Sequence, residues 1–102
     1  MMNPNADVLN AYYLKPIYDH QKSFYKKACV KERGDCKELY SYNTRVAIIK
    51  LGANGMNEKL TLGNYATCSM TTLKHLREFC RQQGFEVYPK GEWSKHYEFG
   101  KF

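Results

Sequence analysis

The sequence has no long apolar run. No window approaches the roughly 20 apolar residues that a membrane-spanning helix needs. The first ten residues, MMNPNADVLN, also lack the basic start and apolar stretch of a secretion signal. We therefore expect an intracellular protein with no membrane partner, in which the four cysteines stay reduced.

Motifs for catalysis or cofactor binding are also missing. The cysteines Cys29, Cys36, Cys68 and Cys80 include no C-x-x-C pair, the short spacing that zinc sites usually use. The GANG stretch at 52–55 lacks the lysine and the strand–loop–helix context of a phosphate-binding loop. Acidic residues are few and scattered, which argues against a two-carboxylate or metal-dependent hydrolase. We expect packed thiols, no metal, no cofactor and no enzymatic activity.

Basic residues and tyrosines are what the sequence has in excess. It has 16 Lys and Arg against 10 Asp and Glu, and nine tyrosines among 102 residues. Residues 21–50 carry eight basic and three acidic side chains, a local charge of +5. Such a concentration of charge favours binding of a polyanion or an acidic protein surface. A solvated face that only keeps the protein soluble is the alternative, and composition does not separate the two.

One α+β domain is expected over residues 1–102, with its core at about 22–88 and a disordered end at 1–5. Apolar residues recur at the helical spacing over 6–14 and predict a short N-terminal helix. Three antiparallel strands are predicted, over 24–32, 37–51 and 59–69, because these runs are rich in Tyr, Val, Ile and Leu and are separated by turn-forming glycines.

A C-terminal helix over 71–83 has the clearest pattern. Its apolar stripe consists of Leu73, Leu76, Phe79 and Cys80. Its solvent side is predicted to hold Lys74, Arg77, Glu78 and Arg81. Ser69 or Thr71 fits the start of this helix, and Gly84 fits its end. The predicted fold is therefore a three-stranded antiparallel sheet covered by one long helix.

The stretch after Gly84 is predicted to hold a short strand near 85–88 and then an aromatic tail. The aromatic residues of that tail are Trp93, Tyr97, Phe99 and Phe102. So many rings do not suit a solvated linker. The tail either packs on its own domain or forms an interface, and a homodimer joined through it is one interpretation.

The hairpin of the first two strands supplies the candidate contact surface. A two-residue loop at 33–34 would pair residues whose numbers sum to 67. The core face would then hold Phe24, Ala28, Val30 and Leu39, and the exposed face Tyr25, Lys27, Lys31, Cys36, Tyr40 and Tyr42. The residues predicted nearest the contact surface are Tyr25, Lys26, Lys27, Lys31, Tyr40, Tyr42 and Arg45. The basic helix face, with Lys74, Arg77 and Arg81, is the second candidate.

Three stretches carry a resemblance: KSFYKKA at 22–28, LYSYNTRVAII at 39–49 and CSMTTLKHLREFCRQQGF at 68–85. With the pattern SYNT-x-VA followed by S-x-TT-x-x-H, they resemble a small domain family of unknown function from phages, plasmids and other mobile elements of Gram-positive bacteria. The resemblance implies an accessory protein in the cytoplasm of a bacterial host cell, and it supplies no functional residues.

That context suggests an anti-CRISPR-like inhibitor of a host defence nucleoprotein. Such a protein would occupy an acidic surface of a CRISPR effector or compete for its guide RNA. The alternative is a DNA- or RNA-binding module with a regulatory role, whose lysines neutralise phosphates while its tyrosines stack on bases.

Overall fold

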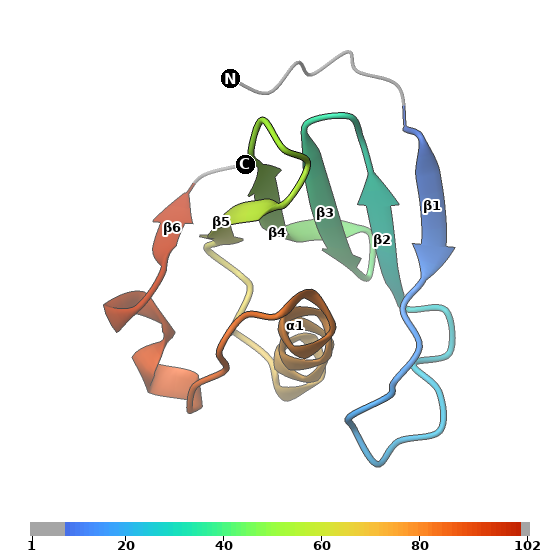
Figure 1. Ribbon diagram of the computed structural model, residues 1–102. Helices are drawn as coiled ribbons and strands as arrows, with labels where there is room; N and C mark the ends of the chain where they lie inside the picture. The colour runs from blue at the N-terminus through green and yellow to red at the C-terminus, as the bar shows by residue number, and fades with distance from the viewer. Residues whose placement is uncertain (1–7, 101–102) are drawn as a thin grey trace.

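One mixed sheet of six strands organises the structure, a computed structural model that describes residues 8–100 (Figure 1). The strands are β1 Asn10–Tyr13, β2 Ala28–Glu32, β3 Cys36–Ser41, β4 Thr44–Leu51, β5 Asn57–Gly63 and β6 Glu98–Gly100. They lie in sequence order, all neighbours being antiparallel except β5 and β6, which are parallel. Helix α1, Met70–Gln83, covers one face of the sheet, and the 3-10 helix η1, Lys90–Lys95, precedes β6. The α+β class is confirmed, but the three-stranded sheet is wrong.

The face beneath α1 is the core. One row of register partners crosses all six strands: Tyr12, Val30, Leu39, Ala47, Leu62 and Phe99. Its four central side chains are completely buried. The predicted helical stripe of Leu73, Leu76, Phe79 and Cys80 is also completely buried and packs against them. Removal of this apolar surface from water is the main term that holds the two layers together.

Helix α1 begins and ends as its flanking residues predict. Ser69 is the N-cap, and its Oγ accepts a hydrogen bond from the Thr72 N–H at 3.1 Å. Gly84 takes a left-handed conformation with φ 85°, after which the Phe85 N–H donates to the Cys80 carbonyl at 2.8 Å. Within residues 8–100, no helix has the length and apolar character to span a membrane.

The predicted N-terminal helix over 6–14 is wrong where the structure describes it. Asn10–Tyr13 forms β1 and pairs with β2 from Asn10↔Glu32 to Tyr13↔Cys29. A helix that must end before Pro16 is too short to be stable by itself, whereas pairing with β2 satisfies the backbone of β1. Residues 6–7, and the predicted disordered end at 1–5, lie outside the described residues.

The strand predicted over 37–51 is two strands. The chain reverses at Tyr42 and Asn43, which have φ angles of 50° and 69°, so β3 and β4 form a tight hairpin. Tyrosine is not a typical residue for such a turn, so the sequence pattern did not indicate a turn here. The first predicted strand also begins later, at Ala28, and the third is β5, which ends at Gly63.

The register of β2 against β3 differs from the prediction by two residues. Paired numbers sum to 69, as in Val30↔Leu39, because the two-residue turn lies at Gly34 and Asp35, one residue later than predicted, and is closed by the Arg33 N–H, which donates to the Cys36 carbonyl at 2.8 Å. A shift of two preserves the faces, since side chains alternate with period two. Ala28, Val30 and Leu39 therefore lie in the core as predicted, but Cys36 is buried rather than exposed.

The aromatic tail packs on its own domain. Trp93 is 1% exposed and belongs to the core, with the rings of Tyr88 and Tyr97 against it. The segment 85–88 is not a strand, and the strand of this region is β6 instead. Phe102 lies outside the described residues. The rings that suggested a homodimer are thus largely engaged within the chain.

Glu78 does not lie on the solvent side of α1, contrary to the prediction. It is 1% exposed, and its Oε1 accepts hydrogen bonds from the N–H groups of Tyr18 and Asp19 at 3.0 and 2.9 Å. Gln82 donates to its Oε2 at 2.6 Å. These bonds fasten the segment between β1 and β2 along the helix, where Figure 1 shows it beside α1.

Candidate functional site

The sheet face opposite α1 carries a hollow over β1, β2 and β3 with a volume of about 390 Å³. Its lining consists of Tyr13, Lys26, Lys27, Cys29, Lys31, Tyr40, Tyr42 and Asn43. Tyr13, Cys29 and Tyr40 are register partners and form one row across the three strands. The other lining residues, apart from Lys31, come from the turn before β2 and the turn between β3 and β4. The hollow therefore depends on strand pairing and on two turns.

Three lysines of this hollow each place an ammonium group over a different tyrosine ring. The distances from Nζ to ring centroid are 4.5 Å for Lys31 and Tyr40, 5.5 Å for Lys27 and Tyr42, and 5.8 Å for Lys26 and Tyr13. No carboxylate within residues 8–100 forms an ion pair with these lysines. The contacts of Lys26 and Lys27 are exposed and that of Lys31 is half-buried. A cation–π contact at an exposed site stabilises by only about 0.5–1 kcal/mol, so a charge-assisted bond to a phosphate group can replace it.

The two turns beside the hollow have unusual backbone conformations. Tyr25 and Lys26 have φ angles of 53° and 61°, and Tyr42 and Asn43 have 50° and 69°. Within residues 8–100 these four are the non-glycine residues with positive φ. For most L-residues this conformation costs roughly 1–2 kcal/mol, and asparagine tolerates it best. The backbone strain of the described chain is thus concentrated next to the hollow.

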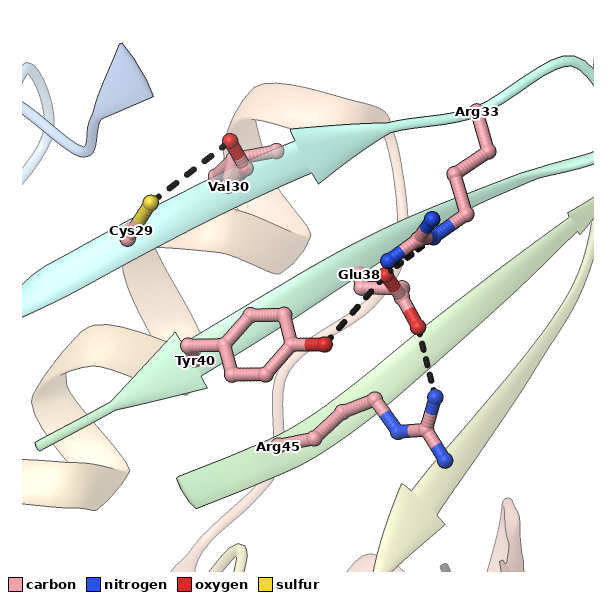
Figure 2. A network of polar contacts seen from close by, with 6 residues as sticks. All are labelled: Cys29, Val30, Arg33, Glu38, Tyr40 and Arg45. Carbon is pink, nitrogen blue, oxygen red and sulfur yellow. Dashed lines mark hydrogen bonds and ion pairs between the residues drawn. The ribbon is translucent and has the colours of Figure 1, made fainter. Parts of the chain in front are cut away.

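A buried carboxylate lies on the same face, between β3 and β4 (Figure 2). Glu38 is 1% exposed, and both of its oxygens are engaged. Arg33 Nε donates to Oε1 at 2.8 Å, and Arg45 Nη1 donates to Oε2 at 2.6 Å. The Tyr40 hydroxyl points at the same carboxylate and lies 3.4 Å from Oε1. This network holds the hydroxyl end of the Tyr40 side chain in place.

The pKa of the Glu38 carboxyl is lower than usual despite its burial. Burial alone raises this pKa, but the hydrogen bonds and charges of Arg33 and Arg45 outweigh burial and lower it. Glu38 is therefore ionised, and its charge is directed to the two arginines rather than to the lysines of the hollow.

A buried Ser–His pair supports the turn between β3 and β4 from the core side. Ser41 Oγ lies 2.8 Å from His75 Nδ1 and 3.1 Å from Thr72 Oγ1. The His75 ring contacts Phe24 edge-on at 4.8 Å and lies 5.9 Å from the Tyr42 ring. Burial lowers the pKa of His75, and the charge of Lys27 lowers it further, while Asp19 opposes them.

The basic helix face lines a different hollow, of about 500 Å³, between α1 and residues 87–89. Lys74, Arg77 and Arg81, the second candidate surface of the sequence analysis, contribute to its lining, but so do Asp19 and Glu78. Arg77 is partly engaged, because it donates to the Tyr88 carbonyl at 3.1 Å. This surface has less uncompensated charge than the hollow on the sheet, and we rank it second.

Most of the residues predicted for the contact surface do come together. Five of the seven line the sheet hollow: Lys26, Lys27, Lys31, Tyr40 and Tyr42. Tyr25 is exposed in the adjacent turn, and Arg45 contacts Glu38 beside the hollow. Sequence reasoning missed Tyr13, Cys29 and Asn43. Tyr13 was missed because its segment was predicted to be helical, although the alternation of Ala11 and Tyr13 with Tyr12 and Leu14 was a signal for a strand.

These features define an α+β protein with a six-stranded mixed sheet, one covering helix and a basic, tyrosine-lined hollow on the open face. Residues 12–95 match a family of unknown function, DUF8033, and the chain belongs to this family. Neither curated proteins nor solved structures give a match.

Proposed function

We propose that this protein is a noncatalytic nucleic-acid-binding protein and that the hollow on the open sheet face is its contact surface. The observation that carries the proposal is the set of three lysines placed over three tyrosine rings around one hollow. Lysines neutralise phosphates, and tyrosine rings stack on bases. The local charge of +5 over residues 21–50 would attract the ligand from a distance.

The burial of the best nucleophile–base pair supports a noncatalytic role. Ser41 and His75 are 2% and 1% exposed and lie between β3 and α1. A substrate cannot reach them without separation of the two layers. Their arrangement instead suits the support of Tyr42, which lies at the surface above them.

An anti-CRISPR-like inhibitor remains a prediction from the resemblance. Competition for a guide RNA would use the same lysines and rings as direct nucleic-acid binding. Occupation of an acidic protein surface would use the lysines alone. A pull-down from a bacterial host lysate, with and without nuclease treatment, distinguishes these routes, because only a protein partner survives the nuclease.

The proposal is tested by charge reversal of two lysines of the hollow. We expect the Lys27→Glu/Lys31→Glu variant to lose most of its affinity for nucleic acid in a gel-shift series at two salt concentrations. For the native protein, three phosphate contacts to a single strand predict that log K falls with log salt with a slope of about −2. Thermal melting should change little, because Lys27 is exposed, Lys31 is only half-buried, and neither forms an ion pair with a carboxylate of residues 8–100.

The matched control is Lys74→Glu/Arg81→Glu, which reverses the same amount of charge on the helix face. If this control weakens binding as much as the sheet variant does, net charge alone determines affinity and the assignment of the hollow is wrong. Absence of any shift by the native protein at low salt overturns the proposed function.

A further inference from the structure

We infer that the hollow holds an unpaired base of a single strand and that Tyr42 is the ring on which this base stacks. The inference rests on the proposed function and narrows it from nucleic acid in general to single strands. Four observations carry it. They are the concave shape of the hollow, the lysines that lie over its tyrosine rings, the support beneath the Tyr42 ring and the backbone conformation of Tyr42.

The concavity of the site favours a single strand. A duplex presents a convex surface of phosphates and keeps its bases stacked inside. In a concave site of about 390 Å³, the tyrosine rings could not reach the bases of a duplex, and only its phosphates would be contacted. An unpaired base can leave the strand and enter the hollow, while the phosphates on either side stay at its rim.

The lysines occupy ring faces that a base would need. Lys27 lies over Tyr42 and Lys31 over Tyr40, each through a flexible side chain. When a strand arrives, the ammonium groups move from the rings to the phosphates, where the attraction is charge-assisted. The ring faces then become available to the base. The same movement of the lysine side chains therefore provides the phosphate contacts and exposes the rings for stacking.

Tyr42 is held in position before any ligand arrives. Its side chain is 49% exposed, but its ring is supported from below by His75, which Ser41 fixes at 2.8 Å. Its N–H donates to the Lys27 carbonyl at 2.9 Å. A ring that is already positioned loses little conformational entropy on binding, which favours its use as a platform.

The backbone at Tyr42 carries strain that the fold does not require. Asparagine, aspartate or glycine would adopt a φ of 50° at this position of a tight turn at less cost than tyrosine. Residues held in such conformations concentrate at ligand sites, where the strain is part of the function. A tyrosine at this position is explained by the ring that it presents to the hollow.

The test measures fluorescence anisotropy with three labelled probes: an oligothymidylate, an abasic strand of equal length, and a blunt duplex that contains the oligothymidylate. We expect the oligothymidylate to bind about tenfold more tightly than either of the others, because one stacked base is lost in both. Tyr42→Asn should reduce binding of the oligothymidylate to the level of the abasic strand and leave abasic binding unchanged. Tyr42→Phe, which keeps the ring, should bind like the native protein.

Tyr65→Asn is the matched control, because Tyr65 is 70% exposed and lies in the segment before α1, outside the lining of the hollow. It should bind all three probes like the native protein. Equal affinity for the three probes, or tighter binding of the duplex, overturns the single-strand inference but leaves the proposed function intact. Failure of every probe to bind at low salt removes both.

Discussion

The N–H of Tyr42 donates to the carbonyl oxygen of Lys27 at 2.9 Å. This hydrogen bond joins the turn between β3 and β4 to the turn that precedes β2. In the second turn the Lys27 N–H donates to the Phe24 carbonyl at 3.0 Å. A lysine and a tyrosine of the hollow are therefore parts of one hydrogen-bonded unit. Because these bonds join backbone atoms, changes that disturb the backbone of either turn should affect both the stability of the hairpin and the shape of the hollow.

The left-handed conformation of Asn43 gives a stability prediction. Asn43→Ala should lower the free energy of unfolding by about 1 kcal/mol, because alanine tolerates a φ of 69° less well than asparagine. Asn43→Gly should be neutral or stabilising, since glycine adopts this φ without strain. Urea denaturation measures both variants. Equal destabilisation by the two substitutions would show that the Asn43 side chain, and not its backbone conformation, matters.

The Glu38 network predicts a clear difference between buried and exposed ion pairs. Glu38→Gln should cost about 2 kcal/mol, because it leaves Arg33 and Arg45 without the carboxylate that both contact. The matched control is Glu98→Gln, which removes an ion pair with Lys59 whose side chains are 71% and 51% exposed. That control should cost less than about 0.5 kcal/mol. Similar effects of the two changes in chemical denaturation would contradict the account of Glu38.

The same carboxylate predicts how stability falls in acid. The pKa of Glu38 is lower in the folded protein than its ordinary value of 4.5. Its contribution is therefore fully present above that value and is lost as the pH falls through the folded pKa. Glu38→Gln should flatten this part of the pH profile of the melting temperature, and Glu98→Gln should not. A native slope retained in Glu38→Gln would assign the acid sensitivity to other groups.

His75 predicts a second pH dependence, nearer to neutrality. Burial lowers its pKa below the ordinary value of 6.5, so the unfolded chain binds a proton more readily than the folded protein. The free energy of unfolding should therefore fall as the pH drops from 6.5 toward the folded pKa. Lys27 lowers this pKa, Asp19 opposes the shift, and the Tyr42 ring lies beside the imidazole.

Urea denaturation between about pH 7 and pH 5 measures this slope. His75→Gln should reduce the slope, whatever it does to stability at neutral pH. His96→Gln is the control, because His96 is exposed and stacks only on Tyr88, at 3.7 Å. A slope that disappears in the control rather than in His75→Gln would refute the assignment.

The four cysteines should separate by reactivity toward a thiol reagent. Burial raises the pKa of Cys80 to about 12, and burial together with Glu38 and Asp35 raises the pKa of Cys36 to about 11, so both should react only after unfolding. Cys68 is exposed and should react at once. Cys29 is half-buried and lines the hollow, so a bound oligonucleotide should slow its labelling and leave that of Cys68 unchanged. Mass spectrometry of labelled peptides reads out each site.

Local sequence patterns were sufficient to predict part of the fold and part of the candidate site. The helix, its cap at Ser69, its end at Gly84 and its buried stripe follow from spacing and from the conformations that these residues favour. The predicted faces of β2 and β3 are correct although the predicted register is not, because a shift of two residues leaves each side chain on the same face of the sheet. For the same reason Lys31 and Tyr40 line the hollow, whereas Lys26, Lys27 and Tyr42 reach it from the two turns.

Contacts between residues distant in the sequence determined the parts of the fold that local sequence patterns did not predict. Residues 10–13 have spacing that suits a helix, but pairing with β2 makes them a strand. Glu78 has the position of a solvent-exposed residue, but the N–H groups of Tyr18 and Asp19 bury it. β6 exists because η1 returns the chain beside β5. The amino-acid sequence by itself determined the helix and the alternation of the strands. The tertiary structure decided the turn at Tyr42, the edge strands and hence the hollow, because their stabilising contacts come from segments far apart along the chain.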